Sequence, residues 1–145
     1  MTFKSRKDSL FKSVMIAIVA LLFFILYLCL LENTKTTDGV ISIIITSLVL
    51  CLLLWIFFGT SYKLTSTTLS YKSGPIKGNV SIAEIHQIIK GKTLWVGLKP
   101  ATASKGLIIK YGKYSELYIS PETNDGFIKE ILKHNSSIEI ITASE

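Results

Sequence analysis

The sequence has few of the residues that build disulfide frameworks and catalytic centres. Its 145 residues include two cysteines and two histidines. Cys29 and Cys51 both stand inside long apolar runs, where they cannot form part of an extracellular disulfide framework. His86 and His134 are far apart in the sequence and have no cysteine nearby, so they indicate neither a zinc site nor a charge-relay pair.

Sequence motifs for phosphate binding and acyl transfer are also missing. The nine glycines form no Gly-x-x-x-x-Gly-Lys loop, and no Gly-x-Ser-x-Gly occurs. The acidic residues show no paired arrangement suited to general acid–base chemistry. We therefore expect a protein that is not an enzyme, with no catalytic residue, no cofactor and no metal ligand.

Two long apolar runs occupy the first half of the chain, at residues 14–31 and 40–58, and neither contains Asp, Glu, Lys, Arg or His. An α-helix rises about 1.5 Å per residue, and about 20 residues cross a hydrocarbon core about 30 Å thick. Each run is therefore long enough to span a bilayer once. Because proton relays and coupled transporters require ionisable groups in the membrane, transport by this chain alone is not expected.

The first run also invites comparison with a secretory signal, because basic residues precede it. It is longer than the roughly 7–15 apolar residues of such a signal, it lacks an Ala-x-Ala cleavage pattern, and a second run follows at once. These features favour a retained helix.

The distribution of positive charge predicts how the two helices are oriented. Only eight residues, 32–39, join the runs, so the helices must form an antiparallel hairpin. Four Lys or Arg residues precede the first run, eleven follow the second, and Lys35 alone lies between them. By the positive-inside rule, both termini face the cytoplasm. We predict a multi-pass protein of the cell membrane, with a basic cytoplasmic N-terminus at 1–13 and a cytoplasmic domain at 61–145.

Residues 61–145 have the alternating pattern of a small β domain. Tyr62 and Leu64 belong to the first predicted strand. Further strands are predicted around 69–71, 80–82, 85–90, 106–111 and 114–120, with a weaker one at 93–98 and a short one at 137–142. The short spacings indicate a meandering antiparallel sheet.

One helix is predicted near the C-terminus. Ser120 suits its N-cap, Pro121 suits its first helical position, and Asn135 suits its end. The apolar stripe that should pack on the sheet consists of Phe127, Ile128, Ile131 and Leu132.

Several short segments, in this order, are the basis of a family resemblance: 59–64, 69–76, 80–89, 105–112, 119–121 and 127–135. They resemble the bacterial PH-like domains of the YyaB-like group, and Phe3-Lys4-Ser5-Arg6-Lys7-Asp8 is similar to a motif that precedes the membrane hairpin of those proteins. The resemblance implies a two-helix transmembrane hairpin followed by a mainly β, PH-like domain. That domain would be an antiparallel, partly open barrel with one C-terminal α-helix.

The lysines of the β domain allow two interpretations. They can merely solubilise strand faces and protect an edge strand. Alternatively, they can attract the domain to anionic lipid headgroups, at about 1 kcal/mol per well-placed cation. The candidate membrane-facing or ligand-contacting residues are Lys63, Lys72, Lys77, Lys90 and Lys92. Residues 61–145 contain no arginine, which argues against nucleic-acid binding.

Two functions of different class follow. The first is a membrane-anchored binding module at the inner face of the cell membrane, with a lipid headgroup, a peptide or another membrane protein as its ligand. The alternative is bacteriocin self-immunity, because immunity proteins of the sublancin type are similar in anchoring and in their PH-like domain. Neighbouring genes for a bacteriocin precursor and its exporter would favour the alternative.

Overall fold

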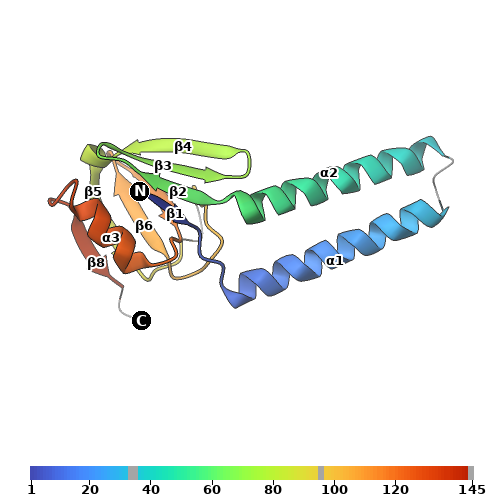
Figure 1. Ribbon diagram of the computed structural model, residues 1–145, viewed down its shortest axis with the longest axis horizontal. Helices are drawn as coiled ribbons and strands as arrows, with labels where there is room; N and C mark the ends of the chain where they lie inside the picture. The colour runs from blue at the N-terminus through green and yellow to red at the C-terminus, as the bar shows by residue number, and fades with distance from the viewer. Residues whose placement is uncertain (33–35, 95–96, 144–145) are drawn as a thin grey trace.

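The computed structural model describes residues 1–32, 36–94 and 97–143. Two long antiparallel helices extend from one end of a sheet domain (Figure 1). Helix α1 spans Ser9–Glu32 and α2 spans Thr37–Gly59. Both helices begin a few residues before the predicted runs, because polar side chains bond their first turns. Thr36 Oγ1, for example, accepts a hydrogen bond from Gly39 N at 3.2 Å.

Both helices are long and apolar enough to cross a membrane, judged by length and composition. Almost none of their apolar surface is buried within the chain, which distinguishes them from the core helices of a soluble domain. The large exposed apolar side chains include Phe23, Phe24, Leu48 and Phe58.

The domain consists of two four-stranded sheets that enclose one core. The first has the order β1 (Thr2–Lys4), β2 (Ser61–Leu64), β3 (Thr68–Ser73), β4 (Ile76–Ser81), with every pair antiparallel. The second has the order β7 (Ser115–Ile119), β6 (Leu107–Tyr111), β5 (Ile85–Lys90), β8 (Glu139–Thr142). A 3₁₀ turn, η1 (Ile82–Glu84), leads from the first sheet into the second. The sheets do not close on each other, as expected for a partly open barrel.

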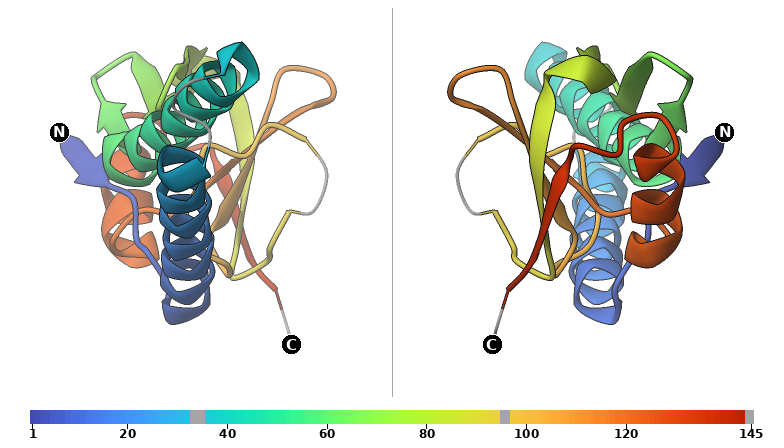
Figure 2. Two further views of the ribbon diagram at one scale, coloured as in Figure 1. Left: turned by 90° about the vertical axis from the view of Figure 1, so that its right-hand side faces the viewer. Right: turned by 90° about the vertical axis from the view of Figure 1, so that its left-hand side faces the viewer.

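Helix α3 (Asn124–Leu132) packs on the sheets at the side where β1 enters (Figure 2). Phe127 is fully buried, and its ring centroid lies 5.2 Å from that of Phe3, edge to face. Ile128 and Ile131 are also buried, and Leu132 packs against the core from a half-buried position. The predicted apolar stripe is therefore confirmed.

Helix α3 begins later than predicted. It starts at Asn124 after Thr123, so the assignment of Ser120 as N-cap and Pro121 as first helical residue was wrong. The physical reason is that the Ser120 hydroxyl is used inside the core, where the side chain is fully buried. The predicted helix end at Asn135 is close, since the α-helix stops at Leu132 and a turn follows.

Three other elements also differ from the prediction. Strand β8 pairs with β5 in parallel, so the domain is not wholly antiparallel. Thr93 and Leu94 lie outside any strand, residues 95–96 are outside the described ranges, and Leu98 makes only an isolated bridge with Leu117. Finally, the basic N-terminus at 1–13 contributes β1 to the first sheet.

Candidate functional site

The N-terminal segment fastens the start of α1 to the sheet domain. Beyond β1, Ser5 N donates to Thr60 O at 3.3 Å and Arg6 N donates to Ser120 O at 2.7 Å. Glu122 N in turn donates to Lys4 O at 3.1 Å. Residues 2–6 therefore run between the end of β7 and the start of β2.

A buried cluster of hydroxyl groups lies beneath this segment. Ser5 Oγ is 3.0 Å from Tyr62 OH and 2.9 Å from Ser120 Oγ, and Thr102 Oγ1 donates to Ser5 Oγ at 2.9 Å. Tyr62 OH donates to Pro100 O at 2.7 Å. Burial raises the pKa of Tyr62, while hydrogen bonds from Ser120 and Ser5 act in the opposite direction. The phenol therefore stays neutral and remains a donor.

Asp8 connects the first turn of α1 to the loop before β6. Its Oδ1 accepts from Phe11 N at 3.0 Å, which caps the helix, and its Oδ2 accepts from Ser104 N at 2.7 Å and Ser104 Oγ at 2.6 Å. Partial burial alone would raise the pKa of Asp8. The bonds from Ser104 and Phe11 and the charge of Arg6 outweigh that effect and hold the pKa below its ordinary value.

Helix α2 joins the sheet domain through a single residue, Thr60. Its Oγ1 donates to Ile56 O at 2.7 Å and lies 2.9 Å from Ser73 Oγ. Gly74 then packs on α2 with φ +55°, and a Cβ atom there would stand 2.7 Å from Ile56 Cγ1. Glycine is required at this turn for both reasons. Each helix is therefore attached to the domain at its own point, which sets the orientation of the domain relative to the hairpin.

The strand register gathers lysines on the outer face of the first sheet. Lys4, Ser61, Lys72 and Lys77 are successive cross-strand partners, so they form one row at the end of the sheet nearest the helices. Lys63 lies two residues from Ser61 and therefore points to the same face. We call Lys4, Lys63, Lys72 and Lys77 the basic sheet face. Like charges directly opposite, as at Lys72 and Lys77, destabilise a sheet, and a bound anion would relieve that cost.

A hollow of about 630 Å³, which we call the basic groove, lies where the sheet meets the two helices. It is lined by Thr2, Lys4, Ser5, Arg6, Lys7, Lys12, Phe58, Gly59, Thr60, Ser61, Lys72 and Glu122. A second hollow of similar size adjoins it over the basic sheet face, with Thr2, Ser61 and Lys72 common to both. Five cationic side chains and one carboxylate thus line the basic groove, which favours an anionic ligand.

Lys7 lies at the meeting point of the basic groove and the helices. Its Nζ is 4.0 Å from the ring centroid of Phe57 and 4.7 Å from that of Phe58, within the range of cation–π attraction. Burial lowers the pKa of Lys7, and the charges of Lys12 and Lys4 lower it further. This ammonium is therefore held among like charges.

The structure divides the five predicted site residues into two groups. Lys63, Lys72 and Lys77 lie together on the basic sheet face. Lys90 belongs to β5 of the second sheet and pairs with Asp125 at 2.5 Å, and Lys92 is exposed in the loop that follows. The last two therefore do not join the site.

Sequence reasoning missed the contribution of Lys4, Arg6, Lys7 and Lys12 to the groove. It used these residues only as an orientation signal, although their closeness to the start of the first apolar run could have pointed to the junction.

In the described ranges, none of the lysines of the basic groove forms an ion pair with a carboxylate. No group of three or more His, Cys, Asp or Glu side chains placed to hold a metal is found among the residues that the structure describes.

Two facing sheets with a C-terminal helix, joined directly to a pair of apolar helices, define a PH-like domain on a helical hairpin. Residues 60–135 match the family model described as "Bacterial PH domain", and the chain belongs to this family. It is also 30% identical over 116 residues to "Uncharacterized protein YyaB" of Bacillus subtilis (strain 168), a match that covers 79% of each chain. The family resemblance seen in the sequence is thereby confirmed. No solved structure matches the chain significantly.

Neither matching description mentions a bacteriocin. Self-immunity therefore stays a prediction from the sequence, and the contacts described above do not favour it over other roles.

Proposed function

We propose that the protein is a non-enzymatic, membrane-anchored binding module of the inner face of the cell membrane. In this proposal, α1 and α2 cross the bilayer as a hairpin with both chain termini in the cytoplasm. The PH-like domain lies against the membrane surface, where its basic groove and basic sheet face bind anionic headgroups.

The exposed surface of the two helices supports the anchoring. Phe23, Phe24 and Leu48 are each more than half exposed, as are many of their neighbours on α1 and α2. An apolar surface of this extent requires either lipid or a partner, and the length of the helices matches the thickness of a bilayer. Their backbone groups are bonded within each helix, as a hydrocarbon environment demands.

The observation that carries the proposal is the double attachment of the domain to the hairpin. Asp8 bonds the first turn of α1 to Ser104, and Thr60 alone separates α2 from β2. The lysine row of the basic sheet face is therefore held beside the helix ends, within roughly a Debye length, about 8–10 Å, of the headgroups. At that distance each cation is attracted to an anionic surface.

A fluorescence experiment tests this placement. With Cys29 and Cys51 replaced by alanine, a single cysteine at Ile76, the first residue of β4, carries the fluorophore, and all lysines remain. The matched control is Tyr114→Cys. Tyr114 is 85% exposed in the turn after β6, which contacts η1 at the end of the domain away from the helices (Figure 1). The labelled proteins are reconstituted in vesicles that contain an anionic phospholipid with a quencher on its headgroup.

We expect strong quenching at position 76 and weak quenching at position 114. Equal quenching at the two positions would show that the domain does not rest on the bilayer in this orientation. Release of the unlabelled protein from cell membranes by high salt alone would contradict anchoring by the helices.

A further inference from the structure

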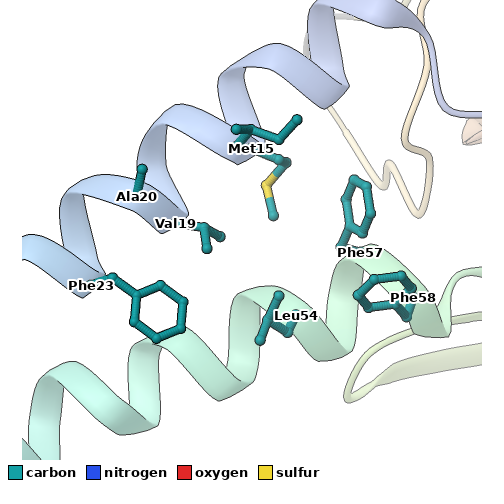
Figure 3. A pocket seen from close by; sticks show the side chains of 8 residues that line it. Met15, Val19, Ala20, Phe23, Leu54, Phe57 and Phe58 are labelled. Atoms are coloured by element: carbon teal, nitrogen blue, oxygen red, sulfur yellow. The ribbon is translucent and has the colours of Figure 1, made fainter.

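A third hollow, of about 410 Å³, lies between α1 and α2 at the end nearest the sheet domain (Figure 3). We call it the apolar groove. It is lined by Met15, Ile16, Val19, Ala20, Phe23, Leu54, Phe57 and Phe58. Every lining residue is apolar, so the groove suits a hydrocarbon chain.

The apolar groove adjoins the basic groove. Phe58 lines both of them, and the Lys7 ammonium lies over the rings of Phe57 and Phe58. On α1, Lys12 lines the basic groove and Met15, one turn further along, lines the apolar groove. Cationic side chains thus give way to apolar ones within one helical turn.

We propose that the two grooves together form a site for one anionic phospholipid, with its phosphate among the lysines of the basic groove and an acyl chain between α1 and α2. This inference rests on the proposed function, because it requires the hairpin to lie in a bilayer. It goes further by naming a discrete ligand of one chemical class in place of general attraction to a charged surface.

Charge and position select this occupant. The basic groove is lined by five cationic side chains and a single carboxylate, Glu122, which favours an anion over a zwitterion. A soluble phosphate would leave the apolar groove unused. Lys12 lies two residues before the apolar run at 14–31, the depth at which the phosphate of a lipid meets its acyl chains.

Native mass spectrometry of the full-length chain released from detergent micelles tests the site. The probes are dioleoylphosphatidylglycerol and dioleoylphosphatidylcholine, which share their acyl chains, and glycerol 3-phosphate as a soluble headgroup. We expect one molecule of the anionic lipid to bind on the order of tenfold more tightly than the zwitterionic lipid. Glycerol 3-phosphate should bind far more weakly than the anionic lipid.

Variants separate the two halves of the site. Lys7→Gln with Lys12→Gln should remove most of the preference for the anionic lipid, whereas Lys7→Arg with Lys12→Arg should keep it. The matched control, Lys92→Gln with Lys129→Gln, changes the net charge equally but affects neither groove, and should also keep the preference. Val19→Trp should fill the apolar groove and weaken the binding of both lipids to a similar extent.

Several outcomes would overturn the proposal. Equal affinity of the parent protein for the two lipids would contradict a headgroup site in the basic groove. Competition by glycerol 3-phosphate with the same affinity as the anionic lipid would indicate that the ligand is a soluble anion. If the parent protein is a dimer and Val19→Trp is a monomer, the apolar groove belongs to a contact between two copies of the chain. If the fluorophore at position 76 is still quenched but the protein shows no preference for the anionic lipid, the proposed lipid site is wrong. The proposed function as a membrane-anchored module is then still supported.

Discussion

The hydroxyl oxygens of Ser5 and Ser120 lie 2.9 Å apart, although 115 residues separate them along the chain. Ser5 precedes α1 and Ser120 follows β7, so this contact joins the first residues of the chain to the end of the last strand before α3. The sheet domain therefore has all its strands and core contacts only when the N-terminal segment is packed against it. As a consequence, α1 leaves the domain from a defined point.

The buried hydroxyl cluster should be important for stability. Ser5→Ala removes one hydrogen-bond partner from each of Tyr62, Ser120 and Thr102, although each keeps another partner. The loss should be at least about 0.5–1.5 kcal/mol, the net contribution of one hydrogen bond. We expect a loss of that size in the free energy of unfolding of the detergent-solubilised protein, measured by denaturant titration. Ser66→Ala, in an exposed turn, should cost little. Equal midpoints for the two variants would mean that water replaces the lost hydroxyl.

Helix α3 should depend on Phe127 for its attachment to the core. The ring is fully buried against Phe3, so Phe127→Ala should lower the free energy of unfolding by about 3–5 kcal/mol. The exposed control Tyr114→Ala should unfold like the parent. If Phe127→Ala unfolds at the same temperature as the parent, the apolar stripe of α3 does not support this core.

Acid should weaken the attachment of α1 through Asp8. Its pKa is depressed in the folded protein, so its stabilising contribution is fully present above the unfolded pKa, about 4, and is lost as the pH falls through the lower folded value. We expect Asp8→Asn to be less stable than the parent at pH 6, and this difference to shrink progressively below about pH 4. Asp38→Asn, in the first turn of α2, is the control. A difference between parent and Asp8→Asn that does not change with pH would contradict the assignment.

The orientation of the hairpin can be tested in intact cells. In a background without Cys29 and Cys51, Thr37→Cys should react with a membrane-impermeant thiol reagent, because the proposed topology places the start of α2 outside the cell. Ser115→Cys, exposed on β7, should react only after lysis. Position 37 is used because Thr36 caps α2. The reverse pattern would place the PH-like domain outside the cell.

Much of the architecture was predictable because it depends on local periodicity. The apolar runs at 14–31 and 40–58 correspond to α1 and α2, since helical length and hydropathy are properties of contiguous residues. The alternation from Tyr62 to Lys90 predicted β2 to β5 for the same reason, and the spacing of Phe127 and Ile131 predicted the buried side of α3.

The site was predictable only in part. Lys72 and Lys77 were among the predicted residues, and the register of β3 and β4 explains why they lie together. Lys90 was grouped with them because its residue type and strand context are alike. Its pairing with Asp125 depends on where α3 packs, which no local pattern encodes.

Local sequence patterns were enough to specify the secondary-structure elements: a hairpin of apolar helices, two runs of strands and one amphipathic helix. How these elements meet depends on contacts between distant residues, which the folded chain alone reveals. Ser120 was predicted as a helix cap because a serine hydroxyl can either cap a helix or form hydrogen bonds in the core. Its core partner Ser5 is distant in the sequence, so no local pattern indicates the second role. Strand β8 joined β5 in parallel because the turn after α3 brings it back along that edge. The basic groove likewise combines Lys4, Lys12 and Lys72, which come close together only after the N-terminal segment has paired with β2.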